Sequence, residues 1–185
     1  MRYLINSGGK FSKLCLQYGI MTRAGLFDYL RDLPYGRNAL RSDFSLVLKE
    51  GQGTCSSKHA FAKSVAIENG WDDIELILCI YKMDESNTSG IGSILKDHRL
   101  AYLPEAHCYL RINDKEIDIT NSQSDLGKLE NVIIERQFIN PEQVVDYKND
   151  YHQAFLKNWI ENEKIGYSLD KIWSIREKCI KLLSA

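Results

Sequence analysis

Apolar residues recur along this chain with two different periods, which separate the segments that form strands from those that form helices. Residues 73–83, DIELILCIYKM, are almost continuously apolar, which is typical of a central strand covered on both faces. Alternation with period two follows in AHCYLRIN (106–113) and KEIDIT (115–120) and predicts a hairpin, and NVIIERQF (131–138) predicts one more strand. We expect these segments to form one antiparallel sheet.

Helical spacing of apolar residues predicts the remaining elements. The expected helices cover residues 22–33, 44–48, 55–69, 140–164 and a last segment that begins at 168. Thr22 is the expected N-cap of the first helix, and Pro34 and Gly70 stop the first and the third. In the last two helices the expected buried faces are Val144, Tyr147, Tyr151, Phe155 and Trp159, and then Ile172, Ile175, Cys179 and Leu182.

These elements together predict the fold class α+β, with helices around an antiparallel sheet. With 185 residues, the chain is long enough for one domain with a sizeable core. No internal repeat or low-complexity linker divides it, so we expect a single domain over residues 1–185.

Composition and charge exclude several classes of function. Lys and Arg number 24 against 25 Asp and Glu, and no basic block stands out, so we expect no nucleic-acid partner. The longest apolar stretch, IELILCIY, is far shorter than the roughly 20 residues of a membrane span, and the first residues lack the apolar core of a signal peptide. The five cysteines form no CxxC pair, which favours free thiols in a reducing cytoplasm.

The sequence GQGTCSSKHA (51–60) puts Cys55 between a glycine-rich turn and a helical pattern. At the N-terminus of a helix, unpaired backbone N–H groups and the helix dipole favour a thiolate. A buried structural thiol is the plain alternative, because free cysteines are among the most buried residues. A nucleophilic role requires a base and a group that orients the base.

The predicted hairpin supplies both groups. If residues 113–114 form a two-residue turn, His107 faces Thr120, and Asp118 lies diagonal to His107 on the same face. A slip by one residue would move the apolar residues of the second strand to the opposite face, so burial selects this register. A carboxylate in that position can hold an imidazole and stabilise its charged form, as a catalytic base requires.

Three short motifs in this order resemble the transglutaminase-like superfamily of papain-type cysteine enzymes: GTC at a helix start, HCYLRIN as a strand that opens with histidine, and DIT on the next strand. The resemblance covers about residues 46–120 and implies a papain-like core, in which a catalytic helix packs on the sheet. It implies that Cys55 is the nucleophile, His107 the base and Asp118 the orienting residue. The helices over about 140–185 lie outside it and are expected as an addition that closes over the cleft.

The chain departs from the calcium-dependent crosslinking members of that superfamily, which favours a bacterial-type branch. Those members carry Gln before and Trp after the cysteine, where this chain has Thr54 and Ser56, and no EF-hand-like loop is present. We therefore expect a cytoplasmic, cysteine-dependent hydrolase or acyltransferase without a cofactor. Its expected substrate is an amide, peptide or ester, a protein included, that reacts through a thioacyl-enzyme intermediate.

Further residues are candidates for the cleft. The backbone N–H of Cys55 is the expected first donor to an oxyanion, and Gln52 and Tyr35 are the candidates for the second. Glu105 shares the face of His107, where it either lines the cleft and binds a substrate amine or belongs to the rim.

Other assignments remain open at this point. Cys55, His59, His107 and Cys108 would satisfy a zinc ion in number, but alternation puts Cys108 on the core face, and we expect no metal. His59 is otherwise a rival base or, with Lys58, a solvated or helix-packing residue. A catalytically silent module that binds a peptide or protein is the alternative to an enzyme.

Overall fold

The computed structural model describes residues 3–6 and 8–182, and its fold class is α+β. Four antiparallel strands form one sheet in the order β3-β2-β1-β4. The strands are β1 (Ile74–Met83), β2 (Leu103–Ile112), β3 (Lys115–Ile117) and β4 (Ile133–Ile139). All four predicted strands are present, although the one predicted over 115–120 ends at Ile117. The continuously apolar segment is β1, which has a strand on each side and is buried along most of its length.

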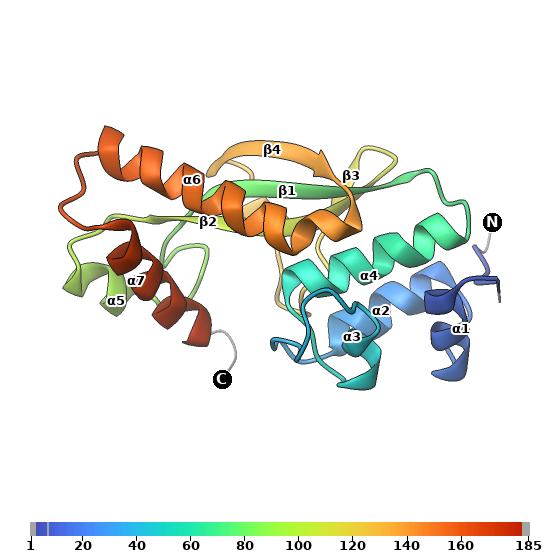
Figure 1. Cartoon of the computed structure of the whole chain (residues 1–185). Coiled ribbons are helices and arrows are strands. Elements are labelled where there is room, and N and C mark those ends of the chain that lie inside the picture. The colour runs from blue at the N-terminus through green and yellow to red at the C-terminus, as the bar shows by residue number, and fades with distance from the viewer. Residues whose placement is uncertain (1–2, 7, 183–185) are drawn as a thin grey trace.

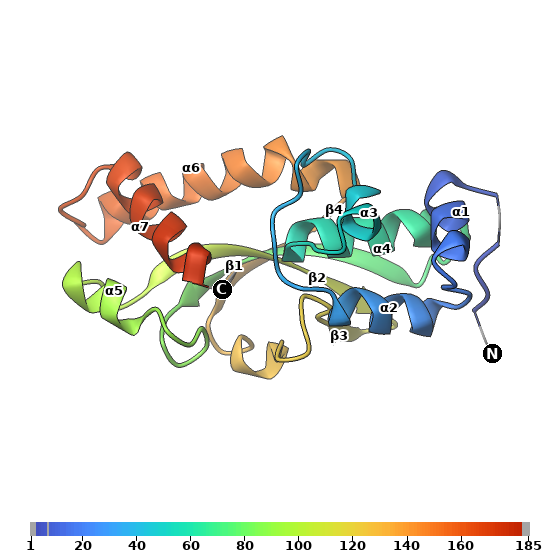
Figure 2. The same ribbon diagram turned by 90° about the horizontal axis from the view of Figure 1, so that it is seen from below.

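The helices pack on this sheet and at its two ends (Figure 1). They are α1 (Lys10–Gln17), α2 (Arg23–Asp32), α3 (Leu46–Lys49), α4 (Cys55–Glu68), α5 (Gly92–Asp97), α6 (Asp146–Asn162) and α7 (Leu169–Leu182), with short 3-10 turns η1 (Leu126–Lys128) and η2 (Pro141–Val144). Figure 2 shows α5 and α7 together at one end of the molecule and α1 to α3 at the other, with α4 and α6 along the sheet between them. None of the helices in the described part of the chain combines the length and apolar character that a membrane crossing requires.

The hairpin between β2 and β3 has the predicted two-residue turn at 113–114. Both turn residues have positive φ, 46° and 65°, as a type I′ turn requires. The ladder runs only as far as the pair of Leu110 with Ile117. His107 and Thr120 are therefore not a ladder pair as predicted, because the chain leaves the sheet after Ile117.

The predicted helix over 55–69 is α4, and its start is strongly specified by sequence. The side chain of Thr54 accepts a hydrogen bond from the backbone N–H of Ser57, and the side chain of Ser57 accepts one from the backbone of Thr54. This reciprocal capping satisfies two N–H groups that a helix start leaves unpaired. Small side chains then let α4 approach the sheet closely; fully buried among them are Ala60, Ala62 and Ala66.

The helix predicted over 140–164 begins later than expected. The turn η2 comes first, and α6 starts at Asp146 after Val145, whose ψ of −92° interrupts the helical path. The predicted buried face was also partly wrong, since Tyr147 is 39% exposed. The side chains that α6 buries are Lys148, His152, Leu156 and Trp159. Two polar residues thus face the interior, where other elements supply their partners.

The last helix, α7, buries most of its predicted face, which includes Ile172, Ile175 and Cys179. Leu182 was wrongly placed in that face, because it is 47% exposed. Ile180, the residue after Cys179, is buried instead. The buried stripe of α7 is therefore wider than the predicted one and reaches the cavities described below.

The N-terminal segment, which sequence patterns did not assign, forms α1 next to α4. Glu68 of α4 accepts hydrogen bonds from the backbone N–H groups of Phe11 and Ser12, at 2.9 and 2.6 Å. A carboxylate from a different helix thus satisfies unpaired N–H groups in the first turn of α1, which the helix dipole also favours.

The turn at 113–114 can be tested because valine tolerates positive φ poorly. We expect Asp114→Val to lower the free energy of unfolding by about 1–2 kcal/mol, whereas Asp114→Gly, which accepts this conformation, should not lower it. Urea denaturation of the wild type and both variants measures the difference. A valine variant as stable as the glycine variant would contradict a type I′ turn at this position.

Candidate active site

The first turn of α4 meets the sheet where β3 ends. Because β3 has only three residues, no strand in the described part of the chain pairs with the outer edge of β2 beyond Leu110 toward the N-terminus of β2. At this open edge the structure brings together Cys55 and His59 from α4, His107 from β2 and Asp118 from the segment after β3.

His107 and Asp118 form a buried ion pair. Nε2 of His107 lies 2.8 Å from Oδ2 of Asp118, and the two side chains are 13% and 7% exposed. Burial by itself lowers the pKa of His107, but the charges of Asp118 and Cys55 raise it more, to a value well above 6.5. Burial raises the pKa of Asp118, but the charge and hydrogen bond of His107, together with His59 and Thr120, hold that pKa well below 3.8. The pair is therefore imidazolium and carboxylate at neutral pH.

Cys55 is the first residue of α4 and is 8% exposed. Its backbone N–H has no acceptor within the helix because of this position. Burial raises the pKa of its thiol, but the positive charges of Lys148 and His107 lower it further than burial raises it. Hydrogen bonds from the His107 side chain and the Cys108 backbone act in the same direction, and the pKa of Cys55 falls to about 6. The sulfur is thus a thiolate at neutral pH, with a cation on either side.

His59 is fully buried and links α4 to the segment that carries Asp118. Its Nε2 accepts a hydrogen bond from the backbone N–H of Ile119 at 2.9 Å, so this nitrogen carries no proton. Its Nδ1, 2.6 Å from the carbonyl oxygen of Cys55, is therefore the protonated nitrogen. Burial lowers the pKa of His59 to about 4 and keeps the ring neutral. With both nitrogens engaged, His59 packs and positions α4 and has no nitrogen left to serve as a base.

Lys58 is also buried, which excludes the solvated side chain and leaves the packing role of the two that were expected. Its Nζ donates hydrogen bonds to the carbonyl oxygens of Leu33 and Thr120, at 2.5 and 2.6 Å. Burial lowers the pKa of this lysine to about 8. Lys58 thus connects the end of α2, the start of α4 and the segment after β3.

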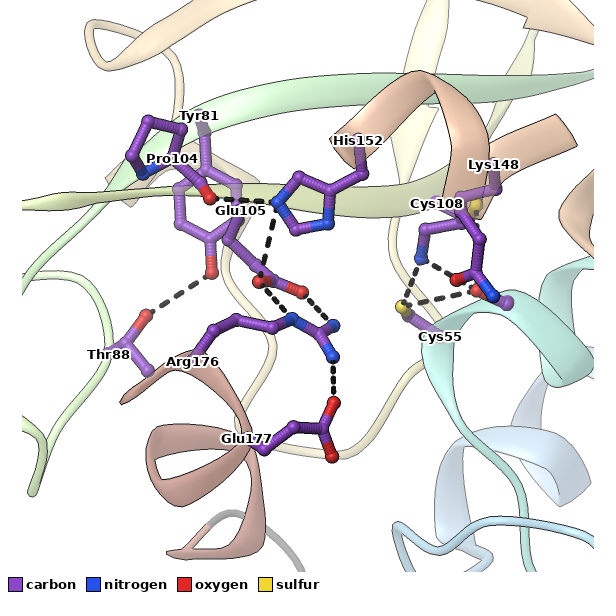
Figure 3. Close-up of polar contacts among 12 residues, drawn as sticks. Cys55, Tyr81, Thr88, Pro104, Glu105, Cys108, Lys148, His152, Arg176 and Glu177 are labelled. Atoms are coloured by element: carbon purple, nitrogen blue, oxygen red, sulfur yellow. Dashed lines mark hydrogen bonds and ion pairs between the residues drawn. The ribbon is translucent and has the colours of Figure 1, made fainter. Parts of the chain in front are cut away.

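Lys148 of α6 is the site residue that sequence reasoning missed. Its Nζ lies 3.7 Å from Sγ of Cys55 and donates a hydrogen bond to Oγ of Ser56 at 2.7 Å (Figure 3). A signal was present: Lys148 and His152 share helical spacing with Leu156 and Trp159. A search for apolar positions alone overlooks such a face.

Glu105 lies in a charged network beside Cys55, and not at an exposed rim. It is 5% exposed and accepts hydrogen bonds from Nη2 and Nε of Arg176 on α7, at 2.5 and 2.8 Å (Figure 3). Arg176 also contacts Glu177 at 2.7 Å, and Nε2 of His152 lies 4.0 Å from Glu105. Burial raises the pKa of Glu105, but the charges of Arg176, His152 and Lys148 and the hydrogen bonds from Arg176 together lower it below its usual value.

The two candidate oxyanion donors lie in different surroundings. Nε2 of Gln52 donates to the carbonyl oxygen of Arg37 at 2.9 Å, and the side chain packs so closely on Gly36 that a Cβ there would lie 2.7 Å from its Oε1. Gln52 therefore holds the loop before α3. Tyr35 lines the cavities next to Cys55, and burial together with the charge of Cys55 raises the pKa of its hydroxyl above 10.

Two cavities meet at Cys55, with volumes of about 400 and 440 Å³. Both are lined by Cys55, Tyr35, Glu105 and Ile180. The first, which we call the lysine-side cavity, is also lined by Arg37, Arg41, Lys148, Arg176 and Glu177. The second, the histidine-side cavity, is also lined by His107, Asp118, Asn87, Thr88, Asn121 and Ser124. A substrate can therefore extend in two directions from the sulfur.

The alternative zinc site is not assembled in the described residues. They contain no group of three or more His, Cys, Asp or Glu side chains placed to hold a metal ion. Cys108 packs in the apolar core, and both nitrogens of His59 are bonded to the backbone. The geometry supports nucleophilic chemistry of Cys55, with His107 and Asp118 as its partners.

The neutral state of His59 has a consequence for stability. Folding lowers its pKa from 6.5 to about 4, so between these pH values the unfolded chain binds a proton that the folded chain does not. The contribution of His59 is complete above pH 6.5 and is lost as the pH falls toward 4, by up to about 3 kcal/mol. Urea denaturation across this range should show a steeper loss of stability for the wild type than for His59→Gln. Equal pH dependence in the two proteins would contradict a neutral buried His59.

Comparisons of the chain with protein-family models, with curated proteins and with solved structures found no match. The resemblance of the three motifs to the transglutaminase-like superfamily therefore stays a prediction. What the chain does has to be argued from the geometry around Cys55.

Proposed function

We propose that this chain is a cysteine-dependent hydrolase or acyltransferase of the transglutaminase-like kind. Its substrate is an amide, peptide or ester, a protein included, which reacts through a thioacyl intermediate on Cys55. The five cysteines are free thiols, which supports a reducing compartment such as the cytoplasm.

The observation that carries this proposal is the contrast among the five buried cysteines. Burial raises the pKa of Cys15 and Cys79 to about 12, and it also raises the pKa of Cys108 and Cys179. Cys55 alone among them has a lowered pKa, about 6. A perturbed thiol in a cleft, beside an oriented histidine, is typical of a catalytic nucleophile.

The proposed reaction begins with attack of the Cys55 thiolate on the carbonyl carbon of the substrate. Because Nε2 of His107 is bonded to Asp118, Nδ1 is the nitrogen that faces the sulfur and the leaving group. It donates its proton to the departing amine or alkoxide, as a general acid. Water or an amine then enters from the histidine-side cavity, gives its proton to His107 and releases the acyl group. Asp118 keeps the ring oriented throughout.

Hydrolysis and acyl transfer share the acylation step, in which the leaving group departs, and differ only in whether water or an amine then attacks the thioacyl intermediate. The histidine-side cavity is lined by hydroxyl and amide side chains such as Thr88, Asn121 and Ser124, and also by the charged residues Asp125 and Lys128. These groups suit a peptide or another polar leaving group, since they can donate and accept hydrogen bonds. This supports a polar leaving group more than an apolar lipid chain.

The proposal is tested by iodoacetamide labelling at pH 6, with the modified cysteine mapped by mass spectrometry. At this pH about half of Cys55 is thiolate, whereas a thiol with a pKa of about 12 is ionised in roughly one molecule in a million. We expect rapid modification of Cys55 alone. The rate should fall with pH below about 6, as the thiolate is protonated.

Two variants show whether the reactivity depends on the proposed partners. His107→Ala removes one of the two cations beside the sulfur, so labelling at pH 6 should slow at least about tenfold. His98→Ala, which removes a histidine near Tyr167, should leave the rate unchanged. If Cys55 in the wild type reacts no faster than the other cysteines, the enzymatic proposal fails and a silent peptide-binding module is favoured.

A further inference from the structure

A buried lysine requires an explanation that packing does not provide. Lys148 is 6% exposed, and an unpaired buried ammonium ion is strongly unfavourable. Its contacts are Sγ of Cys55 at 3.7 Å and Oγ of Ser56 at 2.7 Å (Figure 3). Both belong to the first turn of α4, the helix that presents the nucleophile. The charge of Lys148 is thus directed at the reacting atom.

We infer that Lys148 is a catalytic residue, the charged donor that stabilises the oxyanion formed when Cys55 attacks a carbonyl group. This inference rests on the proposed function, because it concerns the same thioacyl chemistry. It assigns the second donor, beside the backbone N–H of Cys55, to a residue from the C-terminal helices.

The geometry suits this role. An ammonium group has three N–H donors, and contacts with Ser56 and Cys55 use two directions. An acyl carbon bonded to Sγ carries its oxygen one bond further out, and on the side of Lys148 this oxygen comes within reach of Nζ, at about the 2.7–3.1 Å of an oxyanion donor. The side of His107 is reserved for the leaving group, which needs the proton. The oxygen and the leaving group are therefore directed to different cations.

Competing charges around Lys148 are already engaged. The groups that act on it are Cys55, Cys108, Glu105 and Arg176. Glu105 is held by Arg176 in two hydrogen bonds, and Cys108 remains a protonated thiol at neutral pH because burial raises its pKa. The positive charge of Lys148 is thus available to Cys55 and, after attack, to the oxygen.

The step is balanced without any further reactant. The sulfur–carbon bond forms with the electron pair of the thiolate, and the carbonyl π electrons move to the oxygen. Lys148 donates a hydrogen bond to this oxygen and keeps its proton. When the carbonyl group re-forms, the bond to the leaving group breaks and the leaving group takes its electron pair, with the proton of His107 where it needs one.

The inference is tested by comparing two reactions of Cys55 in Lys148→Met. Alkylation by iodoacetamide forms no oxyanion, whereas acylation by p-nitrophenyl acetate does, and nitrophenolate leaves without needing a proton from His107. Both rates are measured at about pH 9.5, where Lys148 keeps its charge in the wild type because its pKa is raised above 10.5. The acylation rate is divided by the alkylation rate of the same variant, which corrects for any difference in the ionised fraction of Cys55. We expect this ratio to fall by about 10²-fold in Lys148→Met.

The controls separate this role from others. Lys157→Met removes a lysine from the exposed face of the same helix and should change neither rate. Lys148→Gln, a neutral donor of similar length, should give an acylation rate between those of the wild type and the methionine variant. A loss of selective alkylation of Cys55 would show that Lys148→Met does not fold. In that case Lys148→Gln is the test variant in its place.

Each outcome decides the matter. If the ratio of acylation to alkylation at pH 9.5 is the same in Lys148→Met and Lys148→Gln as in the wild type, Lys148 only lowers the pKa of the thiol and the inference is overturned. If Cys55 of the wild type is not selectively alkylated at pH 6, the proposed function itself fails, independently of Lys148.

Discussion

The site depends on the two hydrogen bonds of one buried histidine, His59. The backbone N–H of Ile119, which would belong to the sheet if β3 continued, is bonded instead to His59, and the carbonyl oxygen of Thr120 is bonded to Lys58. These two side chains of α4 lead the chain away from the sheet after three residues of β3. The edge of β2 beside His107 is thereby left open for the first turn of α4. The same histidine holds the carbonyl group of Cys55, so it connects the nucleophile with the segment that carries Asp118.

The buried charges around this edge are arranged in pairs, and the pairing favours one ionisation state. An ion pair taken out of water is tolerated only if both partners are charged and hydrogen-bonded. Two such pairs are complete in themselves: His107 with Asp118, and Arg176 with Glu105. The third, Lys148 with Cys55, is complete only when the thiol is ionised. A neutral thiol would leave Lys148 as an uncompensated buried cation, so the fold stabilises the thiolate.

Local patterns were sufficient for much of this arrangement. Period-two alternation predicts the hairpin and its turn at 113–114, because a register slip would expose an apolar face. Asp118 lies beside His107 as expected, but it does so from the segment after β3 and not as a diagonal neighbour in the ladder. A capping residue, Thr54, and the apolar pattern behind it predict where α4 begins. These features depend on residues close in sequence or paired across one turn. The motifs that suggested a transglutaminase-like enzyme lie in the same segments.

Tertiary structure alone decided the rest. Sequence determined which segments are helix or strand and that Cys55, His107 and Asp118 could meet, since burial of one face and the capping of one helix are local constraints. It could not place Lys148 or Arg176, because the partners of a buried charge come from elements roughly ninety and seventy residues away in the chain. A prediction from hydrophobic patterning assigns every lysine and arginine to the solvent-exposed face of its helix. Only the packing of α6 and α7 over the sheet shows that these two cations point inward, toward the sulfur and toward Glu105.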